Sequence, residues 1–153
     1  MMYQTLTFYH NSFRWLVLVS LLLGLIVAYK GYLAKAVFSK TDNLVRHWTA
    51  TIAHIQLVIG MVLYFKSPLM QYFWTNFKTA IYDFQLMFFG LIHSLLMLFS
   101  VILITMGSAL AKRQETDTAK FKTMMVWYTL AFILIFIAVP WPFSPLANRP
   151  YFR

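Results

Sequence analysis

Long apolar runs separated by short polar segments dominate the chain. Four runs are long enough to cross a bilayer, at residues 13–34, 45–65, 84–110 and 123–139. A membrane-spanning helix needs about 20 predominantly apolar residues, and the third run exceeds this, so we expect it to tilt or to project beyond the bilayer. The runs are continuous rather than alternating, which excludes barrel strands. We therefore predict an all-α fold, a four-helix transmembrane bundle that forms one integral membrane domain over residues 1–153.

Polar and turn-forming residues predict where the helices begin and end. Thr41, Asp42 and Asn43 are candidate N-caps of the second span, and Ser67 followed by Pro68 is typical of a helix start. Residues 68–78 are aromatic but too short and polar to span, so we predict a short interfacial helix between spans 2 and 3, with an aromatic-rich loop as the alternative. The segment from Pro140 onward is expected to be irregular.

Composition places the excess apolar surface in a lipid bilayer. Hydrophobic residues make up 61% of the chain and charged residues only 11%, whereas soluble domains carry about 25% charged residues. The net charge of +9 would indicate nucleic acid in a soluble protein. Here the basic residues lie between the apolar runs, so we expect anionic lipid and no nucleic acid as the partner.

Two compositional features exclude particular functions. The chain has no cysteine, which excludes disulfides, thiolate metal sites, iron–sulfur clusters and covalently attached haem. Residues 1–13 contain no Lys or Arg, so we expect no cleaved signal peptide and the first span stays in the mature protein.

The basic residues are divided unequally between the two ends of the predicted bundle. The richer end has Lys30, Lys35, Lys40, Arg46, Lys112, Arg113, Lys120 and Lys122. The other end has Arg14, Lys66, Lys78, Arg149 and Arg153. Because cytoplasmic loops carry the excess of Lys and Arg, the richer end is predicted to be cytoplasmic, with both termini outside.

Two histidines inside the spans suggest a cofactor site. His54 lies eleven residues from Phe65, and His93 lies ten residues from Asp83, which places them at depths of about 16 Å and about 15 Å. Ionisable groups inside a membrane mark function by default. Two imidazoles at one level on antiparallel helices suit the axial ligands of a b-type haem. The alternative is that each histidine hydrogen-bonds a neighbouring helix.

Several neighbours could support such a site. Gly90, about one turn from His93, would leave room for a flat macrocycle. Gln85 could reach a propionate or a water, although it points about 80° away from the His93 direction. Gly90 and Gln85 are also ordinary helix-packing residues. Arg14 could pair with a propionate, and His10, one turn away, could donate to the site or line a quinone pocket. Alternatively, His10 and Arg14 only anchor the first helix at the interface.

Other chemistries have weaker signals. His47 beside Trp48 is interpreted as interfacial, and no second histidine pair is available. His93 and Met97 share a helix face and could hold Cu(I), but Met also fills helix cores. No buried carboxylate pair, phosphate loop or nucleophile motif is present. All four carboxylates lie at helix ends or in loops: Asp42, Asp83, Glu115 and Asp117.

Four stretches carry a family resemblance. They are His10-Asn-Ser-Phe-Arg14-Trp, Ala53-His54-Ile-Gln-Leu-Val-Ile-Gly60 with Leu63-Tyr64-Phe65, Leu103-Ile104-Thr105-Met106-Gly107, and Ala119-Lys120-Phe121-Lys122. Together they resemble short bacterial four-span membrane proteins labelled cytochrome b-like. The resemblance covers nearly the whole chain and implies a four-helix bundle in the bacterial inner membrane, with haem b held by His54 and His93. Such proteins often have an acidic residue before the third-span histidine, where this chain has Ile92, so no carboxylate–histidine pair is expected.

These observations lead to two functional hypotheses. The first is a membrane b-type cytochrome that passes electrons between quinone and a redox partner through one bis-histidine haem, as an electron-transfer subunit rather than a stand-alone enzyme. The second is a cofactor-free accessory subunit of a larger membrane complex, whose aromatic side chains contact other subunits or a second copy of the chain.

Overall fold

The computed structural model describes residues 2–144, and every regular element in that range is helical. Four long helices are long and apolar enough to cross a membrane, so the predicted four-helix bundle is confirmed. The long helices are α1 (Met2–Leu33), α2 (Lys40–Lys66), α6 (His93–Arg113) and α7 (Asp117–Ala138). The short elements are α3 (Pro68–Thr75), α4 (Phe77–Ala80), α5 (Phe84–Met87) and the π-helical turn η1 (Phe88–Ile92).

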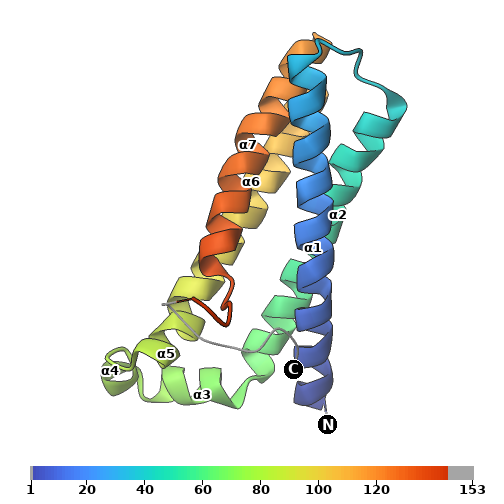
Figure 1. Cartoon of the computed structure of the whole chain (residues 1–153). Coiled ribbons are helices and arrows are strands. Elements are labelled where there is room, and N and C mark those ends of the chain that lie inside the picture. Colours follow the sequence, from blue (N-terminus) through green and yellow to red (C-terminus); the bar gives the residue numbers. More distant parts are fainter. Residues whose placement is uncertain (1, 145–153) are drawn as a thin grey trace.

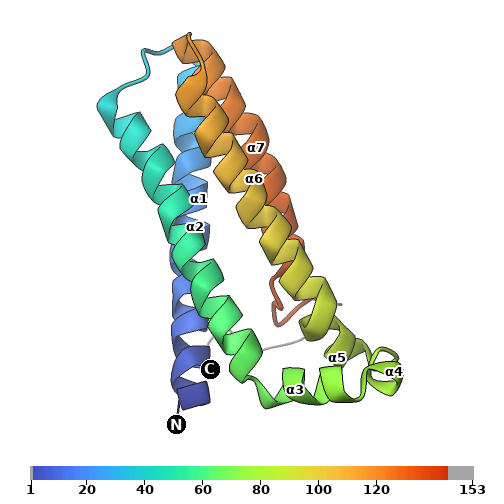
Figure 2. The ribbon, with the colours of Figure 1, turned by 180° about the vertical axis from the view of Figure 1, so that it is seen from behind.

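The long helices alternate in direction and form a closed ring of contacts. Helix α6 packs most extensively against α7, α1 packs against both α2 and α7, and α2 packs least against α6. Helices α5, η1 and α6 continue one another as a single span, Phe84–Arg113. Figures 1 and 2 show that this span lies obliquely and that α5 lies beside the end of α2, with α3 connecting the two.

The helix starts follow local capping rules. Ser39 is the N-cap of α2, and its hydroxyl accepts from the Asp42 N–H while the Asp42 carboxylate accepts from the Ser39 N–H. This reciprocal capping box satisfies two free donors, so the N-cap predicted at residues 41–43 was placed too late. Ser67 precedes Pro68 at the start of α3, as predicted. Thr116 caps α7, so α7 begins six residues before the predicted span.

A helix forms in the segment predicted to be interfacial. Helix α3 covers Pro68–Thr75 and runs crosswise to the four long helices (Figure 1), and α4 follows after a break at Asn76. Its apolar side packs inward through Met70 and Phe73. That α3 lies in the membrane interface stays a prediction.

Tyr128 lies at the centre of the core shared by α1, α2, α6 and α7. Its side chain is fully buried, and its hydroxyl donates to the Arg46 carbonyl at 3.0 Å. A Cβ on Gly24 would lie 3.1 Å from the Tyr128 ring, so the absence of a side chain at Gly24 lets α1 approach α7. The core thus extends along the bundle, from Ala28 and Ala111 to Val139 and Trp141.

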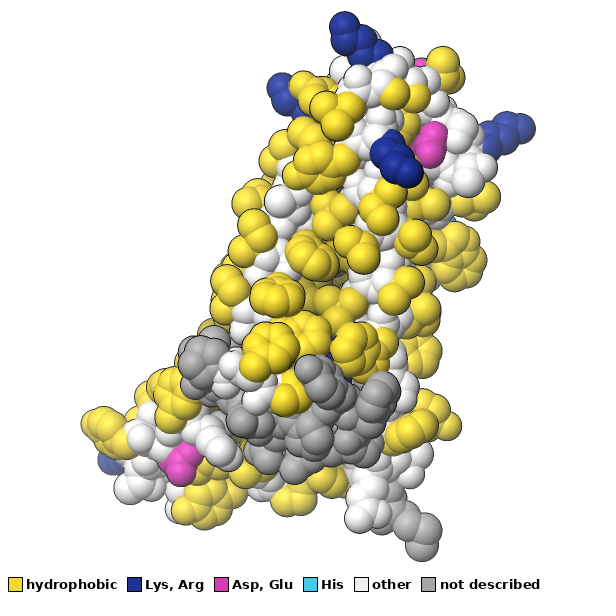
Figure 3. Space-filling view, viewed as in Figure 1, with side chains coloured by type: hydrophobic (Ala, Val, Ile, Leu, Met, Phe, Trp, Pro, Cys, Tyr) yellow, Lys and Arg dark blue, Asp and Glu magenta, His cyan; other side chains and the backbone are white. Residues whose placement is uncertain are grey.

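The surface matches that of a multi-pass membrane protein. Hydrophobic side chains cover the flank of the bundle, and Lys and Arg gather at the end where α1 joins α2 and α6 joins α7 (Figure 3). We call this the basic end. Helix α1 begins and helix α7 ends toward the opposite end of the bundle (Figure 1). The predicted irregular tail beyond residue 144, with Arg149 and Arg153, lies outside the described residues.

Candidate functional site

His93 follows the only π-helical turn in residues 2–144. The His93 N–H donates to the Phe88 carbonyl, five residues earlier, so the turn is wider than an α-turn. Such turns occur frequently at functional sites. The His93 ring bonds through Nδ1 to the Ala138 carbonyl at 2.8 Å, a group at the end of α7 that no later residue of the helix satisfies. Because a carbonyl only accepts, Nδ1 carries the proton and Nε2 keeps its lone pair.

His10 lies beside His93 although the two residues belong to different helices. Their ring centroids are 6.3 Å apart, with an angle of 70° between the planes. Gln56 of α2 holds His10: its amide nitrogen donates to the His10 carbonyl at 3.0 Å and lies 3.2 Å from Nδ1. A Cβ on Gly60 would lie 3.2 Å from the His10 ring, so this glycine makes room for it. Helices α1, α2, α6 and α7 thus all contribute to one imidazole pair.

The Gln56 amide determines which His10 nitrogen is available. In the described orientation it donates to Nδ1, so the His10 proton lies on Nε2, and the Gln56 Oε1 atom is buried without a hydrogen-bond partner. A turned amide would accept from a proton on Nδ1, give up its bond to the His10 carbonyl, and leave a lone pair on Nε2. Gln56 can therefore support either tautomer of His10.

Arg14 lies one turn from His10 on the same helix and is buried. Its guanidinium carbon lies 5.4 Å from the centre of the Trp15 ring. Phe88 and Phe89 have ring centroids 5.9 Å and 6.1 Å from that of His93. The imidazole pair is therefore bordered by a cation and by aromatic rings that exclude water.

His54 lies away from this pair. Its side chain is exposed, and its Nε2 is 2.9 Å from the Thr105 hydroxyl, which itself donates to the Val101 carbonyl. Thr105 lies twelve residues past His93, which is about 18 Å along α6. The structure therefore does not bring the predicted ligands His54 and His93 together, because α2 and α6 pack in a register that places His54 beside Thr105.

A shallow apolar groove of about 200 Å³ surrounds His54 between α2 and α6. Hydrophobic side chains such as Leu57, Ile102 and Met106 form its walls. His54 thus matches the alternative reading of an intramembrane histidine that hydrogen-bonds a neighbouring helix.

Gly90 and Gln85 have other surroundings than predicted. A Cβ on Gly90 would lie 2.7 Å from the Phe73 ring, so Gly90 makes room for α3 and not for a macrocycle. The Gly90 carbonyl accepts from the Tyr64 hydroxyl at 2.7 Å. Gln85 is exposed, and its side chain forms no hydrogen bond with the described part of the chain. Neither residue reaches the imidazole pair in the way expected.

The remaining candidates are placed as follows. His47 is exposed and its ring is 6.0 Å from that of Trp48. Met97 packs against the core. No group of three or more His, Asp or Glu side chains within residues 2–144 is positioned to hold a metal ion, so the Cu(I) hypothesis gains no further ligand.

Gln56 is the residue of this site that the sequence reading missed. A signal for it exists, because Gln56 is an amide in the middle of an apolar run. Gln56 comes two positions after His54, which rotates it about 200° to the other side of the helix. Since His54 faces outward, Gln56 faces the bundle.

Comparisons with known proteins add no relative. The chain matches no family model, and no curated protein or solved structure is similar enough to count as a match.

Proposed function

We propose that the protein is a membrane b-type cytochrome that passes electrons between quinone and a redox partner, with one haem held by His10 and His93. The observation that carries the proposal is the imidazole pair itself, 6.3 Å between ring centroids and contributed by two different helices. His93 keeps its predicted role as a ligand, whereas His10 takes the role that the sequence suggested for His54.

Two features of the pair support an iron site. The two imidazoles come from different helices, and their ring centroids are 6.3 Å apart. Each Nδ1 has a partner, Ala138 for His93 and Gln56 for His10. A ligating imidazole usually donates its other N–H, as His93 does to Ala138 and as His10 would to a turned Gln56 amide. If His10 Nε2 becomes a ligand, the His10 proton moves to Nδ1 and the Gln56 amide turns. The Oε1 atom of Gln56, which is buried without a partner, then accepts from that Nδ1–H.

The protein residues would have separate tasks. A bound haem supplies a one-electron couple at its iron. Ala138 and Gln56 orient the two rings, Phe88 and Phe89 exclude water, and Arg14 offsets propionate charge. The site lies toward the end of the bundle where α1 begins and α7 ends. A quinone could approach it there from the lipid.

A visible spectrum with three matched variants tests this proposal. The full chain is expressed with haem supply, purified, and recorded reduced minus oxidised. We expect b-type α and Soret bands in the wild type, their loss in His10→Ala and His93→Ala, and their retention in His54→Ala. An absence of bands in the wild type discards the proposal. Loss in His54→Ala with retention in His10→Ala would restore the pairing read from the sequence.

One observation favours a second candidate, a cofactor-free accessory subunit of a larger membrane complex. Only 17% of the most apolar window of α2 is buried, against 39% for α1, and His54 is exposed near the middle of α2. A polar group facing lipid is unfavourable, so another membrane subunit or a second copy of the chain could cover this face. Co-purification in mild detergent tests it: a colourless chain that is recovered only with partners supports this candidate.

We further propose a place in the bacterial inner membrane, with the basic end in the cytoplasm, both termini outside and α3 in the outer interface. The support is the concentration of Lys and Arg at one end of four apolar helices. Because the chain has no cysteine, single cysteines at Lys35 and Gln71 can be labelled in intact cells with an impermeant reagent. Labelling of the Lys35→Cys variant but not of the Gln71→Cys variant would contradict the proposed orientation and indicate the reverse one.

A further inference from the structure

A cavity of about 530 Å³ lies at the basic end, between the start of α2 and the α6–α7 connection. Three lysines from different helices line it: Lys40 of α2, Lys112 of α6 and Lys120 of α7. Ser39 and Asn43 supply polar groups, and no Asp or Glu side chain among the described residues belongs to the lining. The cavity is therefore positive and open to a ligand with several hydrogen-bond acceptors.

The nearby carboxylates neutralise only one of the three lysines. Asp117 pairs with Lys120 at 2.9 Å. Asp42 accepts from the Ser39 N–H at 2.8 Å and from the Ser39 hydroxyl at 2.7 Å, so it serves the cap of α2. Lys40 and Lys112 are exposed and form no ion pair with any described residue. Two full positive charges thus face the cavity without a counter-charge.

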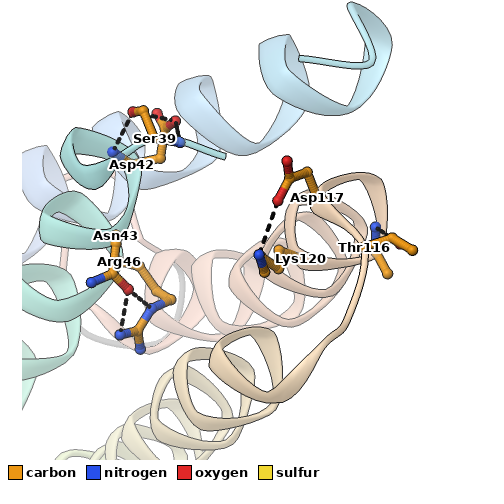
Figure 4. A network of polar contacts seen from close by, with 8 residues as sticks. Ser39, Asp42, Asn43, Arg46, Thr116, Asp117 and Lys120 are labelled. Carbon is orange, nitrogen blue, oxygen red and sulfur yellow. Dashed lines mark hydrogen bonds and ion pairs between the residues drawn. The ribbon is translucent and has the colours of Figure 1, made fainter. Parts of the chain in front are cut away.

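A further cation, Arg46, lies behind the cavity wall. Arg46 is buried, and its guanidinium donates to neutral oxygens: the Asn43 side chain at 3.1 Å and 2.9 Å, and the Ser108 carbonyl at 2.8 Å and hydroxyl at 2.5 Å. Figure 4 shows Arg46 bonded to Asn43 on α2 and Lys120 bonded to Asp117 on α7. A buried charge without an opposite charge is unfavourable, and an anion bound against Asn43 would lower that cost.

Apolar groups at the same level indicate that this end contacts lipid. Phe38 and Leu44 belong to the cavity lining. Leu33, Val37 and Leu44 around it are 77%, 79% and 54% exposed. Apolar side chains exposed to this degree beside lysines are typical of the level where acyl chains meet head groups. A ligand that fits has an anionic head and an apolar tail.

We propose that this cavity binds the phosphate of an anionic phospholipid. Lys40 and Lys112 contact the phosphate oxygens, Lys120 and Asn43 border them, and Arg46 contributes its charge through Asn43. The glycerol and the start of an acyl chain lie against Phe38 and Leu44. Basic pockets between transmembrane helices are known to hold anionic head groups in this way. The site is independent of the haem proposal, since it lies at the opposite end of the bundle.

Lipid titration of the purified full chain tests the proposal. The probe is phosphatidylglycerol, added to protein in neutral detergent and measured as bound lipid by native mass spectrometry. A juxtamembrane lysine contributes about fivefold to the affinity for anionic lipid, so Lys40→Gln/Lys112→Gln should bind about 25-fold more weakly. The control is Lys30→Gln/Lys122→Gln, which removes the same charge from exposed positions outside the cavity and should change binding by less than about twofold. Lys40→Arg/Lys112→Arg should restore binding.

Each alternative result overturns the assignment. Equal losses in the two Gln pairs would show attraction to general surface charge and no site. Equal binding of phosphatidylcholine would show that the phosphate charge is not recognised. Displacement of the lipid by inorganic phosphate at equal concentration would assign the cavity to a soluble phosphate. The Lys40→Arg/Lys112→Arg variant could fail to bind phosphatidylglycerol although its helix content matches that of the wild type. That result would show that positive charge at these two positions does not bind the lipid.

Discussion

His93 and His54 lie in neighbouring spans, yet their surroundings differ in every respect. His93 follows a π turn, donates to a helix-terminal carbonyl and lies beside a second imidazole. His54 lies on the least buried helix and bonds one hydroxyl in a shallow apolar groove. Depth along a helix thus describes neither which face a residue occupies nor what it meets there. Only the region around His93 has the converging polar groups that a cofactor requires.

The largest expected effect distinguishes the two histidines by haem retention. His93→Ala removes a ligand and should abolish the b-type absorption, whereas His54→Ala should retain at least about four-fifths of it, because Thr105 and not a metal is its partner. Haem per protein, measured by pyridine haemochrome on both purified variants, checks this. Equal loss in the two variants would remove the distinction drawn here.

A second test overpacks the contact between Gly90, three residues before His93, and Phe73 of α3. Gly90→Ala would place a Cβ 2.7 Å from the Phe73 ring, and overpacking of this kind costs about 1–3 kcal/mol. We expect the free energy of unfolding, from denaturant titration in detergent micelles, to fall by that amount. The matched control is Gly60→Ala, whose Cβ would meet the His10 ring at the longer distance of 3.2 Å. A larger loss for Gly60→Ala would contradict the packing described.

A third test concerns the group that orients His10. Gln56→Leu keeps the approximate size but removes the bonds to the His10 ring and carbonyl. Loss of an outer partner of a metal ligand typically lowers affinity about 10- to 100-fold. Haem transfer to apomyoglobin measures this, and the control is Gln85→Leu, which changes an exposed amide on α5. Equal transfer from both variants would show that Gln56 does not orient His10.

The smallest effect is expected on the His54 side. Thr105→Val removes the acceptor of His54 Nε2, and side-chain hydrogen bonds between membrane helices average about 0.6 kcal/mol. The same unfolding titration should show a loss of about that size and no change in haem content. A loss above about 2 kcal/mol would mean that His54 contributes to more than one helix contact.

The four spans were predictable because hydropathy is a local property and each run is long enough by itself. The His10–His93 pair was not, because it depends on how α1 packs against α6 in space and on Gln56, which comes from a third helix. Ser39 and Asp42 form a capping box whose spacing is visible in the sequence, although the prediction placed the cap two to four residues later. The π turn has no sequence signal of its own. It also explains Gly90, since a turn that closes on the fifth residue no longer places Gly90 and His93 on one face.

The π turn at Phe88–Ile92 contains one residue more than an α-turn would hold. Deleting a single residue there would convert α5, η1 and α6 into one uninterrupted helix and rotate everything upstream by about 100°. Leu86, which packs against the cluster of Met70 and Phe73, would rotate away from α3 and lose this contact. His93, which lies downstream, would keep its hydrogen bond to Ala138. A one-residue change in length would thus uncouple the crosswise helix from the bundle and leave the imidazole in place.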